Sequence, residues 1–273
     1  MSYKVELSNF GPIVDHACNL GDRLILNLES NHERTFLLKA AYSSLYSLAD
    51  YNLGQNNKNI TEIISYKLLS TFGQNKLSDI VRKGKKTALL KVVSEENKVL
   101  TYSIGSRTEK QAKVIDCDFT TPIVRPVFVP NLDILSLYQE IISSRDKLGF
   151  FDDIYYDIAL TLYMCRNNKN KNQEHLSNVS EVIKELIGGV IKFDNSSNEF
   201  MFFTKRGKFD VSLAPSNIQQ IGALDLLLRN GFITKGSVIF IDSILRRFEW
   251  ESFHELKIIF EMLRDKGVQI VSS

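Results

Sequence analysis

The 273-residue sequence is poor in the residues from which disulfide frameworks and metal centres are built. Its three cysteines, Cys18, Cys117 and Cys165, are odd in number and form no CxxC pair. The four histidines never recur at the spacing of metal ligands. We therefore expect free thiols in a reducing compartment, a cytoplasmic location and no metal site.

Long apolar runs and an excess of one charge are also missing. No run approaches the roughly 20 residues that span a bilayer, and the mixed polar start MSYKVELSNF does not resemble a signal peptide. The 34 basic and 32 acidic side chains leave a formal net charge of +2, which gives no overall attraction to nucleic acid or anionic lipid. We expect no membrane association and, with 44% hydrophobic residues, one large core or a core with a smaller lobe.

Apolar periodicity predicts a mixed α/β chain. The strands expected are 3–8, 13–20, 23–28, 88–93, 99–104, 189–193, 199–205, 208–213, 237–242 and 268–272. The helices expected are 35–51, 60–72, 75–82, 132–147, 151–166, 177–187, 216–230 and 250–266. The closing helix-strand-helix-strand order favours a mostly parallel core sheet with helices on both faces, and three of the five prolines at 122–130 indicate a boundary.

Two short stretches bear on function. LESNHERT, residues 28–35, follows an apolar run and opens a helix, which is where a phosphate-binding loop lies, yet it contains no glycine. Asp242 ends the apolar strand SVIFID, at the carboxyl end where open α/β sheets place ligand chemistry. Such an Asp can orient magnesium, or it can simply cap the strand.

Four separated segments, 7–13, 21–45, 213–243 and 265–273, together resemble the AAA/ABC-type P-loop ATPases of the RecF, OLD and SMC-like lineage. The resemblance implies an ABC-ATPase-like P-loop fold, with antiparallel β additions and a helical lobe around the parallel core sheet. It also implies four regions in the chain. These are an N-terminal half of the ATPase lobe at 1–52, an insertion at 53–130, a helical lobe at 131–188 and the C-terminal half at 189–273.

The Walker A motif of that family, GxxxxGK[ST], is degenerate in this sequence. Leu28 and Glu33 occupy the two glycine positions around Asn31, Arg34 replaces the lysine, and Thr35 keeps the hydroxyl. A Cβ obstructs the approach of backbone amides to phosphate, and a carboxylate at Glu33 repels it. Ser30 and Glu33 have the spacing of a helix capping box, so we expect the corner to be closed by its own groups.

The second half of the expected site is altered in the same way. Asp242 corresponds to the Walker B aspartate, but Ser243 stands where the family has a catalytic glutamate, and a hydroxyl lacks the basicity to activate water. Ser216 matches the signature serine, Asn217 replaces its glycine, and Gln220 follows on the same helix. The resemblance places Ser216, Asn217 and Gln220 at a head-to-tail subunit interface.

These departures predict a pseudo-ATPase with no catalytic residues and no cofactor. The resemblance implies a structural or regulatory subunit that docks on a protein partner or on a second copy, with DNA repair or antiphage defence as the setting. Nucleic acid would then be reached through the partner. Two alternatives remain open: a divergent but active ATPase that binds ATP and magnesium, and a nucleic-acid-binding module whose inserted region carries the function.

Overall fold

The computed structural model describes residues 2–20, 28, 30–54, 58–144, 151–166, 176–242 and 250–272, apart from the side chains of 250–253. Two compact units divide the chain. The first comprises Met1–Pro126 with Val271–Ser273, and the second comprises Val127–Ile270. Among the described helices, none is both long and apolar enough to cross a membrane.

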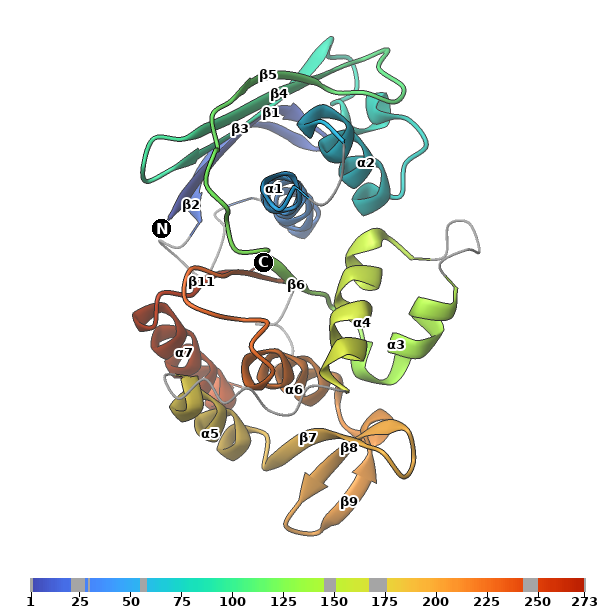
Figure 1. The fold of residues 1–273 in the computed structure, drawn as a ribbon, viewed down its shortest axis with the longest axis vertical. Helices are drawn as coiled ribbons and strands as arrows, with labels where there is room; N and C mark the ends of the chain where they lie inside the picture. The colour runs from blue at the N-terminus through green and yellow to red at the C-terminus, as the bar shows by residue number, and fades with distance from the viewer. Residues whose placement is uncertain are drawn as a thin grey trace. The chain divides into compact units, whose positions relative to one another are not determined.

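The first unit is built on a five-stranded antiparallel sheet whose order is β2-β1-β3-β4-β5 (Figure 1). Its strands are β1 (Tyr3–Phe10), β2 (Ile13–Leu20), β3 (Thr87–Ser94), β4 (Val99–Gly105) and β5 (Lys113–Cys117). Helices α1 (Asn31–Asn52) and α2 (Ile60–Phe72) cover one face of this sheet, and a 3-10 turn, η1 (Leu77–Ile80), lies between α2 and β3. Alternate strand residues such as Val5, Val92 and Tyr102 fill the core between sheet and helices.

The prediction of a mostly parallel core sheet is wrong, because every pairing in this sheet is antiparallel. The reason is the length of the connections. β1 and β2 are joined across Gly11-Pro12 with Phe10 opposite Ile13, and β3 and β4 are joined by residues 95–98. Connections this short can only return the chain antiparallel to itself. The parallel pairing that is described joins β6 and β10 in the second unit. Of the predicted strand 23–28, only Leu28 is described.

The turn after β1 fixes where α1 packs. Asn9 and Gly11 both have a positive φ, 53° and 54°. A Cβ at position 11 would lie 2.3 Å from ring carbons of Phe36, so only glycine allows the close approach of this turn to α1. The ring of Phe36 meets that of Phe10 edge-on at 5.9 Å, and the Gly11 amide donates to the carbonyl of Ile80 (2.7 Å).

The described residues of the second unit form two three-stranded sheets and five α-helices. One sheet has the order β11-β10-β6 and the other β7-β8-β9. Its strands are β6 (Val127–Val129), β7 (Gly189–Asp194), β8 (Glu199–Thr204), β9 (Gly207–Asp210) and β10 (Val238–Ile241). Strand β11 (Gln269–Ser272) begins in this unit, and its last two residues are assigned to the first. Its helices are α3 (Ile134–Ser143), α4 (Asp153–Cys165), α5 (Ser177–Leu186), α6 (Ser216–Arg229) and α7 (Trp250–Asp265), with a 3-10 turn, η3 (Val211–Leu213), before α6.

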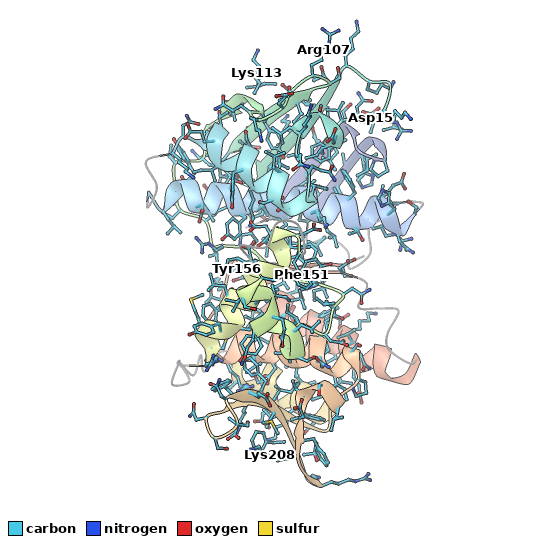
Figure 2. All side chains as sticks on the ribbon, turned by 90° about the vertical axis from the view of Figure 1, so that its right-hand side faces the viewer. Asp15, Arg107, Lys113, Phe151, Tyr156 and Lys208 are labelled. Atoms are coloured by element: carbon cyan, nitrogen blue, oxygen red, sulfur yellow. The ribbon has the colours of Figure 1, made fainter. Side chains whose placement is uncertain are left out.

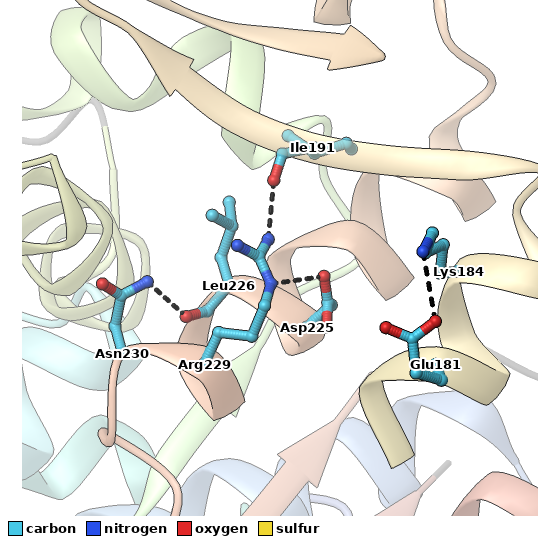
Figure 3. Close-up of polar contacts among 7 residues, drawn as sticks. All are labelled: Glu181, Lys184, Ile191, Asp225, Leu226, Arg229 and Asn230. Carbon is cyan, nitrogen blue, oxygen red and sulfur yellow. Dashed lines mark hydrogen bonds and ion pairs between the residues drawn. The ribbon is translucent and has the colours of Figure 1, made fainter. Parts of the chain in front are cut away.

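Helix α6 is the central element of this unit. It packs against α3, α4, α5, β6 and β7, and every residue from 219 to 228 is buried. Close packing depends on Gly222, where a Cβ would lie 2.2 Å from Ile191. Near the end of the helix, Arg229 pairs with the buried Asp225 (2.8 Å) and donates to the carbonyl of Ile191 (2.7 Å), as Figure 3 shows.

Most predicted elements are present with shifted ends, and in two of them part or all of the predicted segment is a 3-10 turn. The predicted helix 75–82 is wrong in type, since only the 3-10 turn η1 forms there. The predicted strand 208–213 ends at Asp210 and continues as the 3-10 turn η3. Strands β5 and β6 were not predicted. Both are short, and β6 lies in the proline-containing segment that the sequence marks as a boundary.

Candidate functional site

The corner that carries LESNHERT begins helix α1 with a complete capping box. Ser30 is the N-cap in extended conformation (φ −121°). The amide of Glu33 donates to the Ser30 hydroxyl oxygen (3.2 Å), and the amide of Ser30 donates to Oε2 of Glu33 (3.1 Å). Two backbone donors at this helix start are therefore satisfied by side chains, which confirms the predicted capping box.

Arg34 folds back onto the same corner. Its Nε donates to the carbonyl oxygen of Leu28 (3.3 Å), and its amide donates to the carbonyl oxygen of Ser30 (3.2 Å). The structure thus brings Arg34 and Leu28 together. Asn31 and Thr35 lie in the first turns of α1, each with contacts of its own.

Helix α2 begins in the same way. Asn59 is its N-cap, the amide of Glu62 donates to Oδ1 of Asn59 (2.9 Å), and the amide of Asn59 donates to Oε2 of Glu62 (3.3 Å). The reciprocal exchange at α1 therefore recurs at α2, whereas α3, α4, α5 and α6 begin without a side-chain cap. At α1 it places a carboxylate at the N-terminal end of the helix.

The second half of the candidate site lies at the carboxyl ends of the parallel strands β6 and β10. The amide of Asp242 donates to the carbonyl of Val129 (3.0 Å), extending the ladder by one residue. Gln220 of α6 then joins the two strand ends, since its Nε2 donates to the carbonyls of Pro130 and Asp242 (3.2 Å each). Gln220 is fully buried, and its Oε1 has no hydrogen-bond partner among the described residues.

Tyr155 of α4 also faces this strand end. Burial raises the pKa of the Tyr155 phenol, and the negative charges of Asp152 and Asp242 raise it further. The residues 155–163 are dense in aromatics at helical spacing, which indicates core packing rather than a site. The position of Tyr155 near Asp242 could not be predicted from the sequence, because no spacing rule relates α4 to β10. Ser243, which the family resemblance aligns with a catalytic glutamate, lies outside the described residues.

The signature-like residues open helix α6. Pro215 precedes the helix without a side-chain cap, Ser216 and Asn217 are half-buried, and Oδ1 of Asn217 accepts from the amide of Ile218 (2.9 Å). Just before them, Leu213 is 75% exposed. A hollow of about 1050 Å³ lies beside this segment, and its lining includes apolar side chains of β8, β9 and the turn before α6, namely Phe202, Phe209, Leu213, Ala214 and Pro215.

The residues predicted for the site fall in both compact units. Leu28, Asn31, Glu33, Arg34 and Thr35 belong to the first unit. Asp242, Ser216, Asn217 and Gln220 belong to the second, where Asp242 and Gln220 are in contact. In the described parts of the chain, no group of three or more His, Cys, Asp and Glu side chains could hold a metal ion.

The sequence matches no protein-family model, and a search of curated proteins also gives no match. The fold, in contrast, is similar to those of SMC head domains. One is the Smc head domain with an extended coiled coil bound to the C-terminal domain of ScpA from Pyrococcus furiosus, at 11% identity and a TM-score of 0.52 over 100% of this chain and 90% of that one.

A second similar structure is the SmcHead bound to the C-winged helix domain of ScpA. It is 12% identical, with a TM-score of 0.54 over 98% of this chain and 87% of that one. The chain therefore has a mixed α/β fold that resembles SMC head domains. At these identities the likeness concerns the fold alone.

Proposed function

We propose that this protein is a catalytically degenerate ABC-type ATPase that serves as a structural or regulatory subunit. The observation that carries the proposal is the closed start of α1. Glu33 and Ser30 satisfy each other's amides there, and the Glu33 carboxylate occupies a position that the family's motif reserves for a glycine.

The electrostatics of this corner disfavour a triphosphate. At an effective dielectric near 20, two unit charges about 4 Å apart repel by about 4 kcal/mol. Arg34 carries the positive charge of the family's lysine, but its Nε is directed at the Leu28 carbonyl. An Arg also cannot reproduce the compact lysine ammonium. The residues present therefore do not fit ATP with magnesium.

The Walker B-like end supports the same proposal. Asp242 is kept, but the next residue is Ser243, which supplies no general base. The groups described around Asp242 are a buried amide, Gln220, and a phenol, Tyr155, whose pKa is raised. A neutral phenol and an amide are not general bases, and this chemistry supports the proposal of a degenerate site.

The partner surface that we propose is the segment before and at the start of α6. Leu213 is exposed beside an apolar hollow, and Ser216 and Asn217 are partly accessible. The similar SMC heads were crystallised with ScpA domains, which makes a protein partner a reasonable expectation here. Because Gln220 is fully buried, we assign the docking role to its neighbours Ser216 and Asn217. A cytoplasmic setting in DNA repair or antiphage defence belongs to this proposal.

Two measurements test the proposal. Purification of the untagged protein from its native cells, with mass identification of what accompanies it, should return a stoichiometric partner or a homo-oligomer. Replacing Ser216 by Arg should dissociate that assembly in light scattering, while Ser143→Arg, at an exposed position of α3 in the same unit, should leave it intact. A monomer without partners, or equal masses for both variants and the parent, would contradict a docking role.

The alternative of an active ATPase predicts magnesium-dependent phosphate release that is lost in Thr35→Ala and in Asp242→Ala. Release that is insensitive to both substitutions would come from a contaminating enzyme. The proposal expects no release in the parent protein.

A further inference from the structure

We propose that one end of the antiparallel sheet in the first unit binds the phosphate backbone of duplex nucleic acid directly. The proposal starts from two basic loops that are separated in the sequence. Residues 82–86 read RKGKK, and residues 105–113 read GSRTEKQAK. The first loop precedes β3 and the second joins β4 to β5. Each by itself is a common solvated loop.

The strand register brings the two loops together. β3 and β4 are antiparallel with Thr87 opposite Gly105, so the start of β3 and the end of β4 lie at the same end of the sheet. The amide of Ser106 donates to the carbonyl of Lys86 (2.8 Å), which joins the loops directly. β5 begins beside them, with Lys113 opposite Ser103. Figure 2 shows Arg107 and Lys113 projecting at this end of the sheet.

Six exposed cations result, and we call them the basic face. They are Lys83, Lys85, Lys86, Arg107, Lys110 and Lys113. Among the described residues, none of the six forms an ion pair, and Glu109, the one acid in these two loops, is paired with Lys76 (3.2 Å). A chain whose total charge is only +2 therefore gathers six cations, none of them in an ion pair with a described residue, at one end of one sheet.

The two loops are held by backbone hydrogen bonds. The backbone amide of Lys85 donates to the carbonyl of Arg82 (3.0 Å), and the backbone amide of Thr108 donates to the carbonyl of Gly105 (3.0 Å). The 3-10 turn η1 secures the second loop, since the amides of Leu77 and Ser78 donate to the carbonyls of Glu109 and Thr108 (3.0 and 2.8 Å). Little backbone entropy is then lost when the cations meet a ligand.

The composition of the loops selects the class of ligand. Neither loop contains an aromatic or large aliphatic residue, so neither can stack on bases or insert into a lipid layer. Stable attachment to a membrane generally takes an apolar anchor beside the charges. Charges alone suit a regular array of phosphates, which a duplex offers irrespective of its sequence. This surface is independent of the proposed pseudo-ATPase role.

The test is fluorescence anisotropy of the full chain with a labelled duplex of arbitrary sequence, titrated over a range of salt. We expect binding at low salt and a linear fall of log K with log salt concentration. The triple variant Lys85→Ala/Lys86→Ala/Arg107→Ala should bind at least roughly tenfold more weakly, and its salt slope should be smaller by up to about 3 if all three side chains contact phosphates.

The matched control removes the same charge from exposed positions of the second unit, Lys192→Ala/Lys205→Ala/Arg206→Ala. It should retain the parent affinity and slope. Equal losses in both triple variants would mean that net charge, not the basic face, drives binding. Absence of binding by the parent at low salt, or tighter binding to vesicles of anionic lipid than to the duplex, would also overturn the proposal.

Discussion

Ser30 and Glu33 close the N-terminus of α1 by exchanging hydrogen bonds, the Glu33 amide to the Ser30 hydroxyl at 3.2 Å and the Ser30 amide to the Glu33 carboxylate at 3.1 Å. In a phosphate-binding loop such amides are left for the ligand. Here the carboxylate of Glu33, three residues along the chain, accepts from the Ser30 amide instead. On the function proposed above, the chain's own side chains replace the ligand at this corner.

Removing the cap should weaken the fold by a modest amount. Ser30→Ala deletes the acceptor of the Glu33 amide, and we expect a loss of about 1 kcal/mol in the free energy of unfolding, measured by urea denaturation. Asn59→Ala, at the equivalent position of α2, should cost a similar amount. Glu33→Gln keeps a side-chain acceptor and should cost less. An unchanged urea midpoint in Ser30→Ala would show that the capping box does not hold this corner.

Removing one partner of the ion pair inside the second unit should cost much more. Burial raises the pKa of Asp225, and Arg229 opposes that rise. Arg229→Met leaves a buried carboxylate without its cation, so we expect a loss of about 3–5 kcal/mol. The loss should shrink as the pH falls toward the raised pKa, because a protonated Asp225 needs no counter-charge. The double variant Asp225→Leu/Arg229→Met should recover most of the stability. If it is no more stable than Arg229→Met, the penalty does not come from the unpaired carboxylate.

His16 predicts a pH dependence of stability in the first unit. Burial lowers the pKa of His16 below 6.5, and the charge of Glu33 partly offsets this. Below pH 6.5 the unfolded chain takes up a proton that the folded chain resists, so stability is full above that pH and declines below it. Urea midpoints from pH about 8 to about 5 should show a decline that is shallower in His16→Gln. Equal slopes for parent and variant would contradict this assignment.

Gln220 should behave as a structural bridge and not as a docking residue. Gln220→Leu leaves the carbonyls of Pro130 and Asp242 without their shared donor. We expect a cost of about 1–3 kcal/mol, with the mass of any assembly unchanged in light scattering. Dissociation of the assembly without loss of stability would return this residue to the interface that the family resemblance implies.

The sequence predicts local structure well where local rules decide it. The capping box at Ser30 follows from a spacing of three residues, and the hairpin at Gly11-Pro12 follows from turn chemistry. The direction of the main sheet was predicted wrongly because the order of elements at the chain's end was extended to the whole fold. The antiparallel sheet is built entirely from the first 120 residues, and the short connections β1–β2, β3–β4 and β4–β5 already require antiparallel pairing there.

Contacts between distant segments explain the remaining differences. Strand β6 has only three residues, and its place beside β10 depends on pairing across more than a hundred positions of sequence. The basic face has the same origin. In the sequence, Lys86 and Arg107 belong to separate loops and indicate no binding surface. The β3–β4 register brings these loops together. The bridging role of Gln220 could not be predicted either, because its two partners are backbone carbonyls and no side-chain pattern in the sequence indicates them.

The central claim is tested most directly by calorimetric titration of the purified protein with ATP in the presence of magnesium. The closed corner at Ser30 and Glu33 predicts no measurable heat of binding, for the parent protein and for Thr35→Ala alike. A dissociation constant in the low micromolar range for the parent, abolished in Thr35→Ala, would contradict the account and identify an active, divergent nucleotide site.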